Sequence, residues 1–468
     1  MMKKLFLCLS LVCSPLLMYG QSLTPQSDDA GKWGFVDDRG NTVIPFEYDE
    51  VSPFLDGGAA VEKQGHCGLI DASGCALGRG LVYGGIDLIG NHCVYRVELR
   101  GKLGLIDSQG REVLPADCDA IELGDDYVSY GHFLHSPSAT VGMIDYTGRT
   151  LLPEGIMKQT YPLSDGMVVG KGESKTDKTL VWKLYDTAKG TTLELPSPQG
   201  IVYNPFRCGY ALVTESQKKN YFIDHSGKKC STEYEFVGEM QEGHYVVRKD
   251  GLYGVIDSLL RERIACKYEE GGKTVSEGLW NTMIDEEWGY IDLLGRSVIP
   301  FRYDMSQPFY KGYAYVCEMT DTDKRFGLIN HQGNLVVPVK WNDILYDPFG
   351  QGAISTVWVA SGPLFSRLDL KSQKLSHQPG YSTVLFDGNG NSIVSSDGKW
   401  GCVDAEGKLL IPVSVGSEEA VLDMIERIRR DGVTQLSPNM FRRLMIYENS
   451  ERNTHALSEK IDDSLWDY

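Results

Sequence analysis

An Asp that ends a short aliphatic strand and leads into a Gly recurs along most of this chain. The pattern is fullest in WGFVDDRG from Trp33, WGYIDLLG from Trp288 and WGCVDAEG from Trp400. Eleven copies align, with 33–41 residues between successive register residues. The register residues are Asp37, Asp71, Asp107, Asp145, Asp186, Asp224, Asp257, Asp292, Asn330, Asp369 and Asp404. A near-constant period of this length predicts a tandem repeat array.

Each repeat is typical of a short antiparallel β-meander. The apolar strand ends at an Asp-x-x-Gly turn, because Asp accepts backbone hydrogen bonds and Gly adopts positive φ without steric cost. A second apolar run follows and ends in Pro, as in TVIP at 42–45, where a residue without an N–H suits a strand end or edge. The best copies then reach a third, alternating strand. About 36 residues hold three short strands and no helix of normal length, so the fold class expected is all-β.

The strings around Trp33, Trp288, Phe326 and Trp400 resemble the WG-repeat family, named for its Trp-Gly opening. The resemblance covers residues 32–413 and implies a β-rich repeat fold found widely in bacterial proteins, with no catalytic residues to carry over. Several copies depart from the pattern. Lys183, Tyr221 and Ser366 replace the Gly, which puts the strand packing of those copies in question.

Four segments organise the chain: a signal peptide at 1–20, a short linker at 21–31, the repeat array at 32–413 and a helical segment at 414–468. Lys3 and Lys4 followed by an apolar stretch are typical of a cleaved secretory signal, which is too short to span a membrane. Cys8 and Cys13 lack the small preceding residue that lipid attachment needs. We therefore expect an exported protein, periplasmic, on the outer surface or secreted, without a membrane span.

The segment after residue 413 predicts helices. Ser417 is a candidate N-cap before apolar residues at helical spacing, and Gly432 is a candidate stop. Ser437-Pro438 predicts a second helix start, and residues 453–465 a third helix. We expect this segment to cap the last repeat, with partner binding as the alternative.

Two further properties limit the function. Removal of residues 1–20 changes the formal net charge from −18 to −20, which argues against nucleic-acid binding. Nine cysteines remain at wide, irregular spacing, and most are expected to be small buried residues, although export permits a bridge among Cys67, Cys75 and Cys93.

Several patterns suggest chemistry, but each has a simpler structural interpretation. The register carboxylates follow from the repeated turn, although carboxylate pairs serve glycosidases. His132 and His135 have metal-like spacing, but packed or surface histidines are favoured. His66-Cys67 and His92-Cys93 could supply four ligands, but Cys67 occupies the Trp position of a repeat strand, which favours a packing role. Asp387, Asn389 and Asn391 resemble the start of a calcium loop, but Gly398 stands where that loop needs Glu, which favours a hairpin turn. Residues 170–176 lack the residue order of a phosphate-binding loop. No catalytic, cofactor or metal site is therefore assigned.

The favoured function is a non-enzymatic repeat protein with an extended surface for a protein or cell-envelope glycan. The alternative is an envelope hydrolase whose site lies where the repeat pattern lapses, at 125–138, 170–181 or 352–382. Eleven three-stranded repeats fit poorly with a ring of four to eight four-stranded blades, which favours an open or spiralling array. Sequence length alone leaves a closed, propeller-like ring as an alternative.

Overall fold

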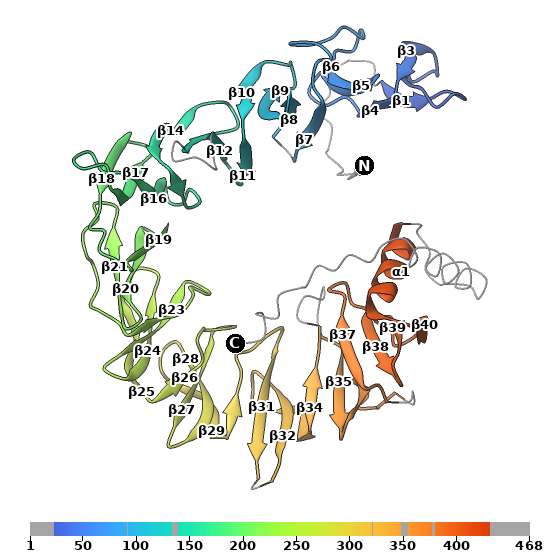
Figure 1. Ribbon diagram of the computed structural model, residues 1–468. Coiled ribbons are helices and arrows are strands. Elements are labelled where there is room, and N and C mark those ends of the chain that lie inside the picture. Colours follow the sequence, from blue (N-terminus) through green and yellow to red (C-terminus); the bar gives the residue numbers. More distant parts are fainter. Residues whose placement is uncertain are drawn as a thin grey trace. The chain divides into compact units, whose positions relative to one another are not determined.

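The computed structural model describes residues 23–90, 92–132, 139–320, 322–347, 354–376 and 380–430. Within these residues the chain forms eleven small antiparallel sheets and one helix, which confirms the all-β repeat fold (Figure 1). The chain divides into two compact units, residues 1–216 with 221–232 and residues 217–220 with 233–468. Each unit is described by itself.

The first unit holds six sheets. Their strands are β1 (Thr24–Ser27), β2 (Trp33–Val36) and β3 (Thr42–Tyr48); β4 (Glu50–Val51), β5 (Ala59–Lys63) and β6 (His66–Ile70); β7 (Gly85–Ile89), β8 (Val94–Leu99), β9 (Lys102–Asp107) and β10 (Glu112–Cys118); β11 (Ala120–Leu123), β12 (Val128–His132), β13 (Thr140–Ile144) and β14 (Thr150–Met157); β15 (Gln159–Thr160), β16 (Met167–Glu173), β17 (Leu180–Asp186) and β18 (Thr191–Glu194); and β19 (Val202–Arg207), β20 (Tyr210–Ser216) and β21 (Lys219–Asp224).

The second unit holds five sheets and the helix. Its elements are β22 (Phe236–Val237), β23 (His244–Lys249), β24 (Leu252–Asp257) and β25 (Glu262–Tyr268); β26 (Glu270–Gly271), β27 (Leu279–Ile284), β28 (Glu287–Asp292) and β29 (Ser297–Tyr303); β30 (Met305–Ser306), β31 (Tyr313–Met319), β32 (Lys324–Asn330) and β33 (Leu335–Trp341); β34 (Asp343–Leu345), β35 (Thr356–Ser361) and β36 (Leu364–Asp369); β37 (Thr383–Phe386), β38 (Ser392–Ser396), β39 (Lys399–Val403) and β40 (Leu409–Val415); and α1 (Glu418–Arg430).

The sheets are out of step with the sequence repeats. The Trp-Gly strand does not open a sheet, because it is the third strand of a four-stranded one, as β28 is in the sheet β26–β29. Seven of the eleven described sheets have four strands, so the expectation of three strands per repeat was wrong for most copies. The missing strand is the very short first one, which has only two residues in several sheets. Two residues are too few to leave a hydrophobic period in the sequence.

A single residue separates the last strand of most sheets from the first strand of the next sheet. Asp49 lies between β3 and β4, and Asp304 between β29 and β30. The backbone N–H of Asp49 donates to Glu62 O at 2.7 Å, and its carboxylate accepts from the N–H of Gln64 at 2.6 Å. Asp304 likewise accepts from the N–H of Met319 at 2.6 Å. The linking residue therefore caps the central hairpin of the sheet that follows.

The Gly of the Trp-Gly pair lies under a bulged fourth strand. Trp288 pairs with Tyr303 and Tyr290 with Ile299, so two steps along β28 match four along β29. This bulge brings Ile299 O to 2.8 Å from the place where a Cβ on Gly289 would be. The equivalent distances are 2.6 Å at Gly34, 2.6 Å at Gly254 and 2.7 Å at Gly401. A side chain at these positions would displace the fourth strand.

The three copies that lack this Gly keep their strand but lose the bulged partner. At Lys183, β17 pairs with β18 in regular register, without a bulge. At Tyr221 and Ser366, the described residues after the turn pair with β21 and β36 as isolated bridges and not as a continuous strand. In these three copies the Gly-substituted strands themselves still form, and the difference from the other copies lies in the fourth strand.

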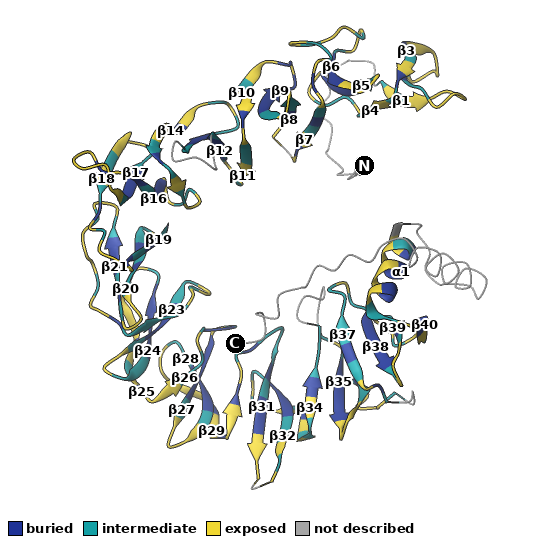
Figure 2. Ribbon diagram, in the orientation of Figure 1, coloured by how far each residue is buried: buried dark blue, intermediate teal, exposed yellow. Residues whose placement is uncertain are grey.

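The hydrophobic core is divided into layers between successive sheets of one unit. One layer joins Tyr290 and Ile299 of the sheet β26–β29 to Ala314 and Val316 of the sheet β30–β33. Phe309, from the Pro-Phe segment, is 2% exposed within this layer, as its repeat position predicts. Figure 2 shows buried residues along central strands such as β35 and β38, with exposed residues at the turns. Each sheet thus depends on its neighbours for burial, as in other repeat proteins.

Helix α1 covers the last sheet (Figure 1). Ser417 Oγ accepts a hydrogen bond from the backbone N–H of Ala420 at 3.4 Å, as expected for an N-cap. Val421, Met424 and Ile425 pack with Ile411 and Val415. The predicted cap is confirmed for this helix, and the helices expected beyond Gly432 lie outside the described residues.

The expected linker at 21–31 contains a strand. β1 pairs antiparallel with β2, from Thr24 opposite Val36 to Ser27 opposite Trp33. Its hairpin repeats the turn chemistry of the array, because Asp28 accepts from the N–H groups of Ala30 and Lys32 and Gly31 has a φ of 77°. The Asp-x-x-Gly string at 28–31 was the signal for this strand.

The nine cysteines of the described chain are free thiols, so no disulfide forms among them. Cys67, Cys118, Cys317 and Cys402 are buried, whereas the other five are exposed or half-buried, so the expectation that most are buried core residues was wrong. No helix in the described part of the chain is long and apolar enough to cross a membrane.

The role of the Trp-Gly glycine can be tested with Gly289→Ala. The added Cβ would meet backbone atoms at 2.8–2.9 Å, so we expect a destabilisation of about 1–3 kcal/mol, measured as a lower Tm. The matched control is Gly85→Ala, where the nearest atom would lie at 3.9 Å. An unchanged Tm for Gly289→Ala would show that the bulge is not tight.

Candidate functional site

The register Asp residues serve as turn residues. Oδ1 of Asp37 accepts from the backbone N–H groups of Arg39 at 2.9 Å and Asn41 at 2.8 Å, and Gly40 has a φ of 78°. Asn330 accepts the equivalent pair of hydrogen bonds, from Gln332 at 3.1 Å and Asn334 at 3.0 Å. A neutral amide therefore replaces the carboxylate with the same geometry. This observation supports the turn interpretation over a line of catalytic carboxylates.

Two other sequence patterns are also structural. Asp387 accepts from the N–H groups of Asn389 and Asn391 at 2.8 and 3.0 Å, and its second oxygen accepts from Arg429 at 2.9 Å. The calcium-like string is thus a hairpin turn. Most of residues 170–176 belong to strand β16 and its turn, so they form no loop before a helix.

The histidine–cysteine pairs do not come together, but His132 joins a different cluster. His92 stacks on Tyr146 with ring centroids 3.7 Å apart, while Cys67 lies in a hydrophobic cluster. Among the described residues, one group of three or more possible metal ligands occurs: Asp117, Cys118 and His132, with ligand atoms within 4.8 Å of one another. His135, the expected partner of His132, lies outside the described residues.

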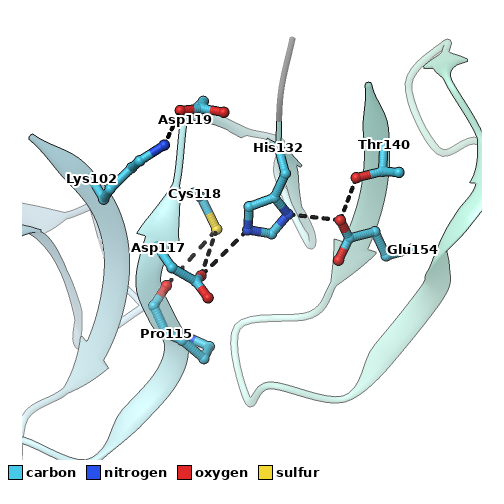
Figure 3. Close-up of polar contacts among 8 residues, drawn as sticks. All are labelled: Lys102, Pro115, Asp117, Cys118, Asp119, His132, Thr140 and Glu154. Carbon is cyan, nitrogen blue, oxygen red and sulfur yellow. Dashed lines mark hydrogen bonds and ion pairs between the residues drawn. The ribbon is translucent and has the colours of Figure 1, made fainter. Parts of the chain in front are cut away.

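The cluster joins two neighbouring sheets of the first unit (Figure 3). Asp117 and Cys118 end β10, while His132 ends β12 and Glu154 lies on β14. His132 Nε2 lies 3.4 Å from Asp117 Oδ1, and Nδ1 lies 2.7 Å from Glu154 Oε1. Thr140 Oγ1 donates to the same Glu154 oxygen. The imidazole is therefore held from both ring nitrogens.

The charges around the cluster shift two pKa values. Partial burial would lower the pKa of His132, but hydrogen bonds to Glu154 and Asp117 raise it above its ordinary value. Burial raises the pKa of the Cys118 thiol to about 12, with a further contribution from the Asp117 carboxylate. The thiol of Cys118 therefore keeps its proton near neutral pH, and the imidazole of His132 is more easily protonated than an ordinary histidine.

A second candidate site is a cleft of about 310 Å³ between the sheet β15–β18 and strand β19. Tyr161, Lys171 and Trp182 are its most distinctive lining residues, together with Gln159 and Thr160. The rings of Tyr161 and Trp182 are nearly parallel, with centroids 6.0 Å apart, and Lys171 Nζ lies 4.6 Å from the centroid of the Trp182 ring. Trp182 is buried and donates from Nε1 to Ile201 O at 3.0 Å, so Tyr161 supplies the exposed ring.

A third cleft, of about 150 Å³, lies in the second unit near Arg367. The guanidinium donates to Thr356 Oγ1 at 3.1 Å and to Ala405 O. These bonds fix the turn around Asp404, so Arg367 is committed to structure. The lapsed segments 125–138, 170–181 and 352–382 thus contribute to the cluster at His132, the cleft at Tyr161 and the cleft at Arg367, respectively.

Comparison with known proteins identifies the repeat. Residues 33–65, 222–253, 288–318 and 326–354 match the model of the WG containing repeat. This chain therefore contains WG repeats in these four segments. The matched WG repeats include three of the four strings, at Trp33, Trp288 and Phe326, on which the resemblance was based.

The solved structures that match this chain have low sequence identity and low TM-scores. A eukaryotic initiation factor is 11% identical over 76% of this chain and 95% of its own, with a TM-score of 0.32. BamB from Moraxella catarrhalis is 14% identical over 48% of this chain and 78% of its own, with a TM-score of 0.22. The extracellular domain of a one component system from B. thetaiotaomicron is 10% identical over 85% and 72%, with a TM-score of 0.24. No curated protein matches the sequence.

The turn role of the register Asp predicts a pH effect. Partial burial would raise the pKa of Asp145 and Asp257, but hydrogen bonds from backbone N–H groups and from the Arg at the fourth following position lower it. The pKa of Asp292 is also lowered, and the hydrogen bond from the backbone N–H of Arg296 is the largest cause. A lowered folded-state pKa stabilises the protein above the unfolded value of about 3.9, and this contribution is lost as pH falls through the folded value.

We therefore expect the variant with Asn at positions 145, 257 and 292 to keep its turns and to lose less stability in acid than the parent. The measurement is Tm between about pH 7 and pH 3 for both proteins. The control with Ala at the same positions should be less stable at every pH, because the backbone N–H groups lose their acceptors. Equal acid sensitivity of parent and Asn variant would contradict the assignment.

Proposed function

We propose that this protein is exported and binds a saccharide of a cell-envelope polymer in the cleft at Tyr161. The observation that carries the proposal is the exposed Tyr161 ring beside Lys171. Aromatic faces suit the apolar face of a sugar ring, while a few polar groups around a cleft fix its orientation. A volume of about 310 Å³ is at the lower end of small-molecule sites and suits one or two sugar units.

The lining groups favour binding over hydrolysis. They are aromatic rings, an amide at Gln159, a hydroxyl at Thr160 and an ammonium at Lys171. A glycosidase typically needs two carboxyl groups on either side of the scissile bond. Lys171 instead suits an acidic sugar, since its ammonium is a positive charge in a chain of formal net charge −18.

Export rests on the N-terminal sequence. Lys3, Lys4 and the apolar stretch after them favour a cleaved signal, and envelope polymers lie where such a signal delivers the chain. The formal net charge also disfavours nucleic acid as the partner.

The cleft can be tested by titrating the mature chain with the peptide-free disaccharide of N-acetylglucosamine and N-acetylmuramic acid, whose lactyl group is a free carboxylate, and with the neutral tetramer of N-acetylglucosamine. We expect the acidic disaccharide to bind and Tyr161→Ala to weaken its binding about tenfold, since an aromatic contact contributes about 0.5–1.5 kcal/mol. Tyr161→Phe keeps the ring and should bind like the parent. Tyr210→Ala, outside the cleft on β20, is the matched control.

Two results would overturn the proposal. The first is no binding of either saccharide by the folded parent, and the second is equal affinity for the parent and for Tyr161→Ala. The Tm of each variant shows whether it has folded. Tighter binding of the neutral tetramer would contradict the role of Lys171.

The export step has its own prediction. When the full-length chain is expressed in a bacterium with a cell envelope, we expect the mature chain to begin at Gln21 and to leave the cytoplasm. N-terminal sequencing after cell fractionation measures both. Recovery of an uncleaved chain from the cytoplasm would contradict export.

A further inference from the structure

Three departures from the repeat meet at His132. Cys118 takes a position that is aromatic in four other sheets, at Tyr48, Tyr268, Tyr303 and Trp341, and Met157 or Val415 in two more. The smaller Cys118 side chain is fully buried at the junction between the sheets β7–β10 and β11–β14, and it offers a thiol where a large ring usually packs.

The second departure is from the first two sheets, where a surface ion pair takes this place. In the first two sheets Lys63 Nζ lies 2.9 Å from a carboxylate oxygen of Glu47, which is the residue just before Tyr48. His132 holds the position of Lys63, since each pairs with the residue before the Trp position. Asp117 holds the position of Glu47. The imidazole of His132, whose nitrogen can hold a free lone pair, thus replaces the ammonium of Lys63 beside a carboxylate at the equivalent position.

The third departure is one inserted residue in β14. Val141 pairs with Met157 and Met143 with Leu152, so the bulge spans five steps, whereas the other described bulges of this kind span four. Gly155 takes a φ of 85° to accommodate it. The insertion places Glu154 against His132 Nδ1. Bulges are found beside functional sites because they re-aim a side chain.

From this convergence we propose that Asp117, Cys118 and His132 bind a zinc ion, with Glu154 as the positioning residue. Tetrahedral zinc with nitrogen, oxygen and sulfur ligands needs ligand atoms about 3.3–3.6 Å apart. His132 Nε2 lies 3.4 Å from Asp117 Oδ1, and Cys118 Sγ lies 3.7 Å from the same oxygen. Imidazole, thiolate and carboxylate together suit zinc, whereas calcium and magnesium prefer oxygen ligands alone.

The surroundings of His132 match those of a zinc-bound histidine. Such histidines donate from the other ring nitrogen to a carboxylate, and that carboxylate is itself hydrogen-bonded. Here Nδ1 faces Glu154, and Thr140 donates to Glu154 in turn, which leaves Nε2 directed at Asp117 and Cys118 (Figure 3). Asp117 is exposed while Cys118 is buried, so a fourth position for solvent lies on the Asp117 side.

Binding exchanges a proton for the metal. The Cys118 thiol releases its proton as the sulfur–metal bond forms, and His132 binds through the lone pair of Nε2 while its Nδ1–H donates to Glu154. The ion would join β10 of one sheet to β12 of the next. Zinc therefore ought to raise the Tm of the protein, since it binds the folded state alone.

The experiment uses the mature chain after treatment with a chelator. Cobalt(II) replaces zinc as a visible probe, because a cobalt–thiolate bond gives a charge-transfer absorption band. We expect one equivalent of cobalt to produce the band and zinc to remove it by displacement. Cys118→Ser should lose the band, while Cys317→Ser, at another buried cysteine, should keep it.

Glu154→Gln separates positioning from ligation. This variant should keep the band at saturating cobalt but bind zinc roughly 10–100-fold more weakly. Zinc should raise the Tm of the parent and of Cys317→Ser, but not that of Cys118→Ser. The proposal is overturned if equilibrium dialysis finds no cobalt bound at micromolar concentrations, or if Cys118→Ser keeps the band through exposed thiols such as Cys75.

Discussion

The fourth strand of a sheet crosses the Trp-Gly strand so closely that no side chain fits at the Gly. This contact determines the form of most sheets, because the bulge that it permits sets the pairing of Trp288 with Tyr303 and the place of the exposed Pro300. It also shows why the Trp and the Gly occur together. The Trp side chain packs beside the fourth strand, while the lack of a side chain at Gly lets the backbone of the fourth strand cross close to the Gly. Where Lys183 replaces Gly, the fourth strand runs regularly instead.

Short acidic side chains then hold the turns and the junctions. Asp37 and its equivalents close the turn before the fourth strand, and Asp49 and Asp304 cap the central hairpin of the following sheet. A third group joins neighbouring hairpins, as Glu242 accepts from the N–H groups of Glu277 and Gly278, and Glu277 from that of Gly312. Part of the excess negative charge of this chain is therefore structural, because carboxylates bind backbone N–H groups that strands leave unpaired.

The sequence predicted the fold class, the number of repeats and the turn role of the register Asp, because these depend on local chemistry that recurs. It could not predict the boundaries of the sheets. A period fixes the length of a repeat but not the point at which the chain passes from one sheet to the next, and two-residue strands such as β26 leave no pattern.

The cluster at His132 could not be predicted from the sequence for a different reason. The sequence paired His132 with His135, whereas the structure brings together residues from three strands whose contact depends on register. One signal was present. The spacing of 41 residues between Asp145 and Asp186 is the longest in the array, and it contains the residue inserted beside Glu154.

The offset between repeats and sheets has a consequence for dividing the chain. A fragment that began at Trp288, where the sequence repeat begins, would start with the third strand of a sheet and expose the edge that β27 normally covers. A fragment that began at Asp304 would keep the sheet β30–β33 whole. An excised segment therefore keeps its strand pairing when both of its ends lie at these single linking residues, and the Trp-Gly motif marks the middle of the intact sheet.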